Sequence, residues 1–453
     1  MASGAVPYVD AWDHKPPGVH LVHAVADILP GLDHWGWTWL LTLLATCATS
    51  WLLVGILRTI VATPVAVVAG LGGTLGLGQF LFSLGGGMSE SFAVLPATAG
   101  LALSLRPRPT PPRMALAGML ISMAVVISPQ LVPAGVAVLA IVVSSGGVAV
   151  ATFLAGTAAP ALGLLAWLIT AGALPAFADA LVTYNAAYRG AAGPGLEVLL
   201  PWVVLVLIGL VGPALAGVAA LRHGTVAVRR IGLGSLAWIV VAVVLVALQG
   251  RLYGHYAIGL VIPLTILAAI GVGDGWSRIR AGPLRWVVVG VGTGLVGLSL
   301  VVGAAAARME LVMIEAVNVR AVAVAAWVQR EGLQGEPMLV WGNAPQVYLF
   351  SASPPATRYG FLYPLTTPGY STAATVLEVL ASLEASPPTL VVDAGSDAPG
   401  EPGFPPLLVD RPVATDGRDL DILDPLRTFV ADRYELTEVV EGWPVYRLLE
   451  AGR

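Results

Sequence analysis

Long apolar stretches separated by short polar segments recur through the first two thirds of the chain. A helix needs about 20 mostly apolar residues to cross a bilayer, and most of these stretches reach that length. They predict ten membrane spans, at residues 38–57, 61–83, 91–105, 113–128, 131–145, 148–172, 197–221, 231–249, 256–276 and 286–307. The pattern is typical of a polytopic membrane protein.

The spacing of apolar positions changes after residue 307. Residues 308–331 predict an amphipathic helix, and beyond it short strand-like runs alternate with helical patterns. Strands are predicted at residues 338–341, 389–393, 436–440 and 445–449, helices at 372–386 and 422–432, and a surface loop at 395–406. This order is typical of a small α/β domain. The predicted division is an outer loop at 1–37, a transmembrane domain at 38–307 and an α/β domain at 308–453.

Composition excludes an ordinary soluble enzyme. Only 11% of the 453 residues are charged and 57% are hydrophobic, whereas an average soluble domain carries about 25% charged residues. Of the 27 acidic residues, 19 lie from Glu310 onward. The basic residues are spread over short loops, which argues against nucleic acid as a partner. The single cysteine, Cys47, lies in the first apolar stretch, so a disulfide framework is excluded.

Arginine placement predicts the orientation of the spans, because short cytoplasmic loops carry excess Lys and Arg. Placing residues 1–37 outside puts ten arginines in the inner loops and two, Arg189 and Arg251, in the short outer loops. Both termini and the α/β domain are then expected on the outer face. A chain that begins outside without a preceding span suggests that one upstream span is missing from this sequence.

The densest polar segment before the C-terminal region is residues 7–18. It contains Asp10, Asp13, His14 and Lys15, and Lys15 is the only lysine among 23 basic residues. An ammonium is a compact point charge that suits a phosphate oxygen. A carboxylate here could remove a proton from an acceptor hydroxyl while Lys15 stabilises a departing phosphate. A solvated loop whose charges pair with one another explains the same residues equally well.

Two further outer segments contain candidate residues. Glu90 follows three glycines and opens the third span, where a carboxylate either benefits from the helix dipole or faces a polar cavity. The loop before the ninth span contains Arg251, His255 and Tyr256. A guanidinium can hold a phosphate with two hydrogen bonds, although aromatic residues at this depth are often only interfacial anchors.

Four histidines, His14, His20, His23 and His34, lie in the first 34 residues. The spacing of His20 and His23 fits one helical face, but no carboxylate completes an established metal-binding pattern. We therefore assign no metal site. Imidazoles are equally suited to a position beside lipid headgroups.

The segment Y-V-D-A-W-D-H-K-P-P at residues 8–17 resembles the first-outer-loop motif of bacterial GT-C glycosyltransferases that use polyprenyl-phosphate sugars. This branch is similar to protein O-mannosyltransferases and to the aminoarabinose transferases that modify lipid A. Further matching segments follow in the same order, at residues 89–92, 250–256, 262–264, 340–348 and 353–359. The resemblance covers nearly the whole chain. Relatives carry one span before this loop, which agrees with a missing first transmembrane helix.

The resemblance implies a GT-C fold of about ten transmembrane helices with a small extracytoplasmic α/β domain, in a bacterial plasma membrane. It implies inverting transfer of a hexosyl or pentosyl group from a polyprenyl-phosphate sugar to an unidentified lipid, glycan or protein acceptor. Asp13, Asp10 and Glu90 would be the catalytic carboxylates, with the choice of base open because His14 stands where one branch has the acid. Lys15, Arg251, His255 and Tyr256 would bind the donor phosphate.

The resemblance implies no cofactor, and assistance by a divalent metal stays open. The enzyme alternative is an oligosaccharide or polymer ligase that uses a diphosphate carrier. The non-enzyme alternative is a polytopic transporter or a non-catalytic membrane assembly subunit. Transporters commonly place ionisable residues near the bilayer midplane, whereas here the polar groups gather at the outer rim, which favours chemistry at the membrane surface.

Overall fold

The computed structural model describes residues 4–107, 109–190, 203–204, 207–249, 253–278, 283–395, 406–408 and 421–449. The chain forms two compact units. The first, here called the helical unit, contains residues 1–3, 15–170 and 195–310. The second, the α/β unit, contains residues 4–14, 171–194 and 311–453. The segment 1–37, predicted as one outer loop, is thus divided between the units after residue 14.

Helices occupy each of the ten ranges predicted as spans. The helices with residues in the helical unit are α1 (Pro17–Ile28), α2 (His34–Leu57), α3 (Thr63–Leu77), α4 (Phe80–Ser83), α5 (Ser89–Ser104), α6 (Pro111–Ile127), α7 (Val132–Val143), α8 (Gly147–Thr170), α12 (Ile208–Ala220), α13 (Val226–Gln249), α14 (Ile258–Arg278) and α15 (Pro283–Arg330). Proline lies in the first turn of α1, α3, α6 and α7, where its missing N–H removes no intrahelical hydrogen bond.

Four helical segments are long and apolar enough to cross a membrane, namely α2, α8, α13 and the segment Gly254–Ser277 that contains most of α14. Shorter apolar helices accompany them, among them α3, α6 and α12. The mostly helical membrane domain expected from the apolar pattern is therefore confirmed. The count of ten spans stays a prediction, since length and composition alone support four among the described residues.

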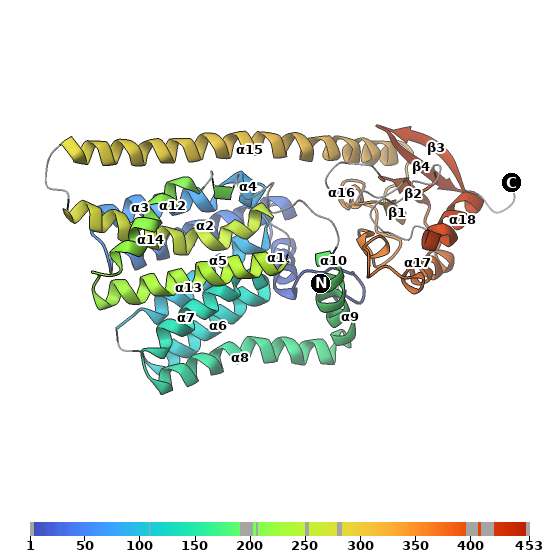
Figure 1. Cartoon of the computed structure of the whole chain (residues 1–453). Helices are drawn as coiled ribbons and strands as arrows, with labels where there is room; N and C mark the ends of the chain where they lie inside the picture. The colour runs from blue at the N-terminus through green and yellow to red at the C-terminus, as the bar shows by residue number, and fades with distance from the viewer. Residues whose placement is uncertain are drawn as a thin grey trace. The chain divides into compact units, whose positions relative to one another are not determined.

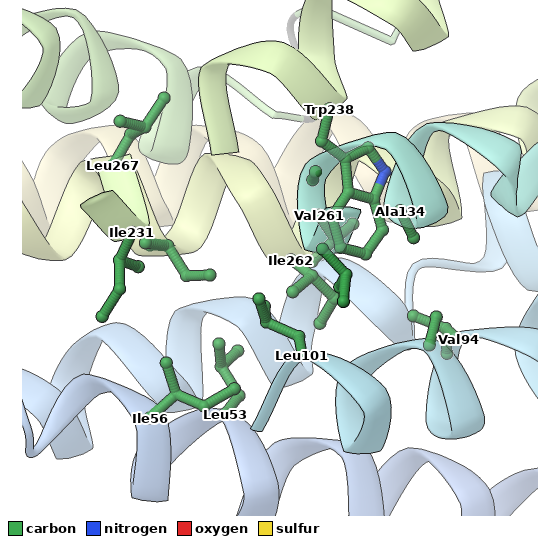
Figure 2. Close-up of a cluster of buried hydrophobic side chains, with 14 of the residues drawn as sticks. Leu53, Ile56, Val94, Leu101, Ala134, Ile231, Trp238, Val261, Ile262 and Leu267 are labelled. Atoms are coloured by element: carbon green, nitrogen blue, oxygen red, sulfur yellow. The ribbon is translucent and has the colours of Figure 1, made fainter. Parts of the chain in front are cut away.

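The core of the helical unit combines large apolar side chains with close backbone approaches. Figure 2 shows Leu53 of α2, Leu101 of α5, Trp238 of α13 and Val261 of α14 in one buried cluster. Elsewhere the helices approach so closely that only glycine fits. A Cβ atom at Gly156 of α8 would lie 1.9 Å from the carbonyl oxygen of Ala115 in α6. Small residues that admit close backbone contact are typical of membrane helix packing.

The predicted span 286–307 and the predicted amphipathic helix 308–331 form one continuous helix, α15 (Figure 1). No proline lies in α15 after Pro283, and alanines fill the stretch 304–307. Alanine has the highest helix propensity. The change from an apolar to an amphipathic pattern along the sequence therefore does not end this helix.

The α/β unit contains the predicted sheet. Its strands are β1 (Met338–Trp341), β2 (Leu390–Asp393), β3 (Tyr434–Val440) and β4 (Trp443–Leu448), in the order β1-β2-β4-β3. The pair β1/β2 is parallel, and the pairs β2/β4 and β3/β4 are antiparallel. The helices are α16 (Gln346–Phe350), α17 (Ala373–Ala385) and α18 (Asp424–Arg433). The four predicted strands and two predicted helices are confirmed within two residues at each end.

Two other segments belong to the α/β unit. Residues 4–14 form a turn, and residues 174–190 form three consecutive helical pieces, α9 (Leu174–Ala178), a wide π-helical turn (Asp179–Tyr184) and α10 (Asn185–Gly190). These segments supply most of the aromatic side chains described below. The predicted surface loop at 395–406 lies almost entirely outside the described residues.

Candidate active site

Glu90 is a buried acid of the helical unit. It lies in the first turn of α5 and its side chain is only 3% exposed. The Ser128 hydroxyl, just after α6, donates to Glu90 Oε1 at 2.9 Å, and the Ser89 hydroxyl donates to Oε2 at 3.0 Å. A buried carboxylate requires such partners. Two hydroxyls from two different segments therefore fix the orientation of Glu90.

His255 lies in the helical turn Gly254–Ala257 that precedes α14. Its imidazole interacts electrostatically with both Glu90 and Lys15. Gly254 lets this turn approach α4, because a Cβ atom there would lie 2.2 Å from the Leu81 carbonyl oxygen. Three of the residues predicted from sequence, Lys15, Glu90 and His255, are thus electrostatically linked through the His255 imidazole.

Aromatic rings surround His255. The Tyr253 ring stacks on its imidazole with a centroid separation of 5.5 Å, and the Tyr256 ring meets it edge-on at 4.8 Å. Tyr256 is therefore close to the predicted phosphate-binding histidine. Arg251, predicted for the same role, lies outside the described residues.

A chain of three side chains links α1 to the start of α2. His34 Nδ1 donates to Asp27 Oδ1 at 2.6 Å, and His23 Nδ1 and His34 Nε2 hydrogen-bond at 3.2 Å. Burial, followed by the neighbouring His34, Lys15 and His20, lowers the pKa of His23 to about 4. His23 is therefore neutral near pH 7. Within the described part of the chain, no group of three or more His, Cys, Asp or Glu side chains could hold a metal ion.

Asp10 closes a turn in the α/β unit. Its Oδ2 accepts a hydrogen bond from the Val6 N–H at 2.7 Å, and its side chain is exposed. Tyr8, inside the same turn, has a positive φ of 73° and is fully buried. These contacts give Asp10 a local structural role beside the catalytic role predicted for it.

Asp13 is more accessible than Glu90. Its Oδ1 lies 3.6 Å from His14 Nδ1, and both side chains are 25% exposed. The His14 imidazole packs against Tyr184 and Tyr188 at centroid separations of 5.2 and 5.8 Å. Asn185 Nδ2 donates to the His14 carbonyl oxygen at 3.2 Å. Residues 184–188 therefore hold the end of the motif loop next to Asp13.

Sequence reasoning missed two residues that contact the candidate site. Ser128 binds Glu90, and the only signal for it was a serine at the end of a predicted span. Arg358 Nη1 donates to the Tyr8 carbonyl oxygen at 3.0 Å, across 350 positions of sequence. Arg358 lies in one of the segments that resembled the glycosyltransferases, but nothing in that segment indicated its partner.

Solved structures with the same architecture exist. The structure of ArnT from Cupriavidus metallidurans in the apo state matches 96% of this chain and 88% of its own, with 14% sequence identity and a TM-score of 0.56. ArnT from the same organism bound to undecaprenyl phosphate matches 97% of this chain and 88% of its own, with 13% identity and a TM-score of 0.59. The chain has the GT-C fold. The GT-C fold predicted from the motif loop is therefore confirmed.

The arabinofuranosyltransferase AftD from Mycobacteria is also matched by this GT-C chain. The match covers 94% of this chain and 36% of AftD, with 16% identity and a TM-score of 0.47. No protein-family model matches the chain, and no curated protein matches its sequence.

Proposed function

We propose that this chain is a membrane glycosyltransferase that moves a sugar from a polyprenyl-phosphate donor to a lipid, glycan or protein acceptor. The observation that carries the proposal is the grouping of Lys15, the only lysine, with His255 and the buried Glu90 in a chain with the GT-C fold. One of the matched GT-C structures is bound to undecaprenyl phosphate. A cation such as the Lys15 ammonium stabilises a negatively charged leaving group at a membrane surface.

The donor phosphate is bound by Lys15. Its ammonium carries three hydrogen-bond donors and is exposed. His255 and Tyr256 contribute further donors from the turn before α14. Arg251 precedes His255 and Tyr256 by a few positions in the sequence, and its guanidinium adds further hydrogen-bond donors for the phosphate.

Asp13 is the general base. Glu90 already accepts hydrogen bonds at both oxygens and is buried, whereas Asp13 is a quarter exposed. Asp13 precedes Lys15 by two residues, so the length of the chain keeps their Cα atoms within about 7 Å. Asp10, at an exposed turn, is the second choice as base, and Glu90 acts by holding the polar end of the helical unit in place.

In the reaction, the acceptor hydroxyl oxygen forms a bond to the anomeric carbon while the bond from that carbon to the phosphate oxygen breaks. Asp13 takes the hydroxyl proton, and polyprenyl phosphate leaves with its negative charge beside Lys15. Attack opposite the leaving group inverts the anomeric configuration. General base catalysis of this kind contributes about 10²- to 10⁴-fold in rate.

The reaction takes place on the outer face of a bacterial plasma membrane. Support for this orientation comes from the arginines, ten of which fall in predicted inner loops and two in short outer loops. The residues assigned to catalysis and to phosphate binding fall in segments predicted outside, except Tyr256, which is the first residue of a predicted span at its outer end. The α/β unit then lies on the same face as the acceptor.

The proposal is tested with the purified chain in lipid nanodiscs and a panel of radiolabelled polyprenyl-phosphate sugars. We expect release of labelled sugar by the wild type and a loss of at least 100-fold in both Lys15→Ala and Asp13→Asn. The matched control is Asp33→Asn, because Asp33 caps α2 through the Gly36 N–H and asparagine caps equally well.

Full activity in Lys15→Ala or in Asp13→Asn would remove the assignment of that residue. Donor binding by the wild type without any release of sugar would overturn the transferase proposal and favour the assembly-subunit alternative. Comparing the anomeric configuration of donor and product by NMR tests inversion separately.

A further inference from the structure

Arg358 holds the motif loop by its side chain and by its backbone at once. Arg358 Nη1 donates to the Tyr8 carbonyl oxygen at 3.0 Å, and the Arg358 carbonyl oxygen accepts from the Trp12 N–H at 2.8 Å. These two contacts fall on both sides of the turn at Asp10. Every residue in these contacts belongs to the α/β unit.

The Arg358 guanidinium is itself fixed in orientation. Arg358 Nε lies 2.7 Å from Glu378 Oε1 of α17, and Nη2 donates to Glu378 Oε2 at 3.2 Å. Nη2 also donates to the Tyr359 hydroxyl oxygen at 2.8 Å. Contacts on two edges of a planar guanidinium fix its orientation. An ammonium in its place could rotate and would not be fixed in the same way.

The loop that Arg358 holds has a conformation that needs support. Tyr8 adopts the left-handed region at φ 73°, which is unfavourable for a residue with a side chain. The Tyr8 ring packs edge-on against Phe177 at 5.3 Å, and the Trp12 ring packs against Tyr184 at 4.7 Å. Such a conformation persists only where surrounding contacts determine it, and the Arg358 contacts are the polar part of that surrounding.

We propose that Arg358, oriented by Glu378, is a positioning residue that sets the conformation of residues 8–13 and thereby the placement of the Asp13 carboxylate. The inference rests on the proposed glycosyl transfer. It gives the α/β unit a role in catalysis, because an arginine in the loop after α16 and a glutamate of α17 shape the segment that carries the base. Neither residue needs to touch the donor.

The first experiment measures kinetics in Arg358→Ala, Arg358→Lys and Glu378→Gln, made in the full chain. We expect kcat to fall about 10- to 100-fold in Arg358→Ala while the donor KM stays within twofold, because donor binding is assigned to Lys15 and His255. Arg358→Lys should recover little, since an ammonium lacks the planar fork. Glu378→Gln should retain more activity, because its amide oxygen still accepts one hydrogen bond.

Arg447→Ala is the matched control, because Arg447 is an exposed arginine on β4 of the same unit. It should keep wild-type kcat and KM. Unchanged kcat in Arg358→Ala, or a rise in donor KM without a fall in kcat, would overturn the proposal.

The second experiment does not depend on activity. Hydrogen exchange followed by mass spectrometry should show at least tenfold faster exchange at residues 8–13 in Arg358→Ala, with β1 and β2 unchanged. Unchanged exchange at residues 8–13 would overturn the positioning role even if the chain is an active transferase. Faster exchange in a chain without transferase activity would instead confirm the contact and place the failure in the proposed function.

Discussion

The helical unit and the α/β unit hold their candidate residues by different means. In the helical unit, short side-chain hydrogen bonds join neighbouring helix ends, as between Ser128 and Glu90, which are 38 positions apart. In the α/β unit, a charged side chain reaches a loop 350 positions away and binds its backbone. Apolar surroundings allow few polar groups, so the helical unit depends on close helix packing. The α/β unit depends on an ion pair and aromatic contacts.

The largest expected effect comes from a substitution that disrupts the helix packing on which the helical unit depends. In Gly156→Ala the new Cβ atom would lie 1.9 Å from the Ala115 carbonyl oxygen, so α6 and α8 must separate. Overpacking of this kind typically costs about 1–3 kcal/mol. We expect a lower unfolding temperature than in the wild type, measured by tryptophan fluorescence of the protein in nanodiscs.

Gly163→Ala is the matched control on the same helix. Nothing lies within 4 Å of a Cβ atom built at Gly163, and alanine favours the helix by up to about 1 kcal/mol. This variant should unfold at the same or a higher temperature. Equal destabilisation of both variants would contradict close packing of α6 on α8.

Much of the architecture could be predicted from the sequence, because the apolar patterns of the strands are local. Residues 338–341 were predicted as a strand and form β1 with the same bounds. The continuity of α15 was not predicted, because the surroundings of a helix can change without a helix-breaking residue. Charge and motif order predicted Lys15, Glu90 and His255 as candidates. Ser128, which binds Glu90, and Arg358, which binds the Tyr8 backbone, come from tertiary contacts that no local pattern contains.

A second prediction concerns acid stability in the helical unit. The pKa of His23 falls from 6.5 to about 4 on folding, so the unfolded chain binds more protons between these values. Stability is therefore full above pH 6.5 and is lost as the pH falls towards 4, by about 3 kcal/mol at most. The charged and titratable groups that act on His23 are His34, Lys15, His20 and Asp27.

Hydrogen exchange of α1 measures this loss. Between pH 7 and 4.5, protection of α1 should fall in the wild type and fall less in His23→Gln, whose amide stays neutral. The comparison needs correction for the intrinsic pH dependence of exchange, for which an unfolded peptide of the same sequence serves. An equal fall in both proteins would show that His23 is not the titrating group.

The smallest expected effect has the opposite sign and lies in the α/β unit. Asp393, at the end of β2, is 1% exposed, and burial raises its pKa from 3.8 to about 6. The Asp393 carboxylate therefore binds a proton more tightly in the folded state than in the unfolded state. This contribution to stability is present below pH 3.8 and is lost as the pH rises through 6. The amide N–H groups of Leu407 and Gly395 donate to the carboxylate at 2.6 and 2.9 Å and lower its pKa, an effect already contained in the value of about 6. The loss is then about 3 kcal/mol at most.

Hydrogen exchange of β2 between pH 4 and 7, corrected in the same way, should show protection that decreases as the pH rises. Asp393→Asn should remove that dependence, because its amide does not titrate. The two units are then distinguished by sign, since acid weakens α1 and strengthens β2 in one sample. If protection of α1 and of β2 changed in the same direction with pH, both units would be responding to one shared titration. The buried imidazole of His23 and the buried carboxyl of Asp393 would then not explain the pH dependence.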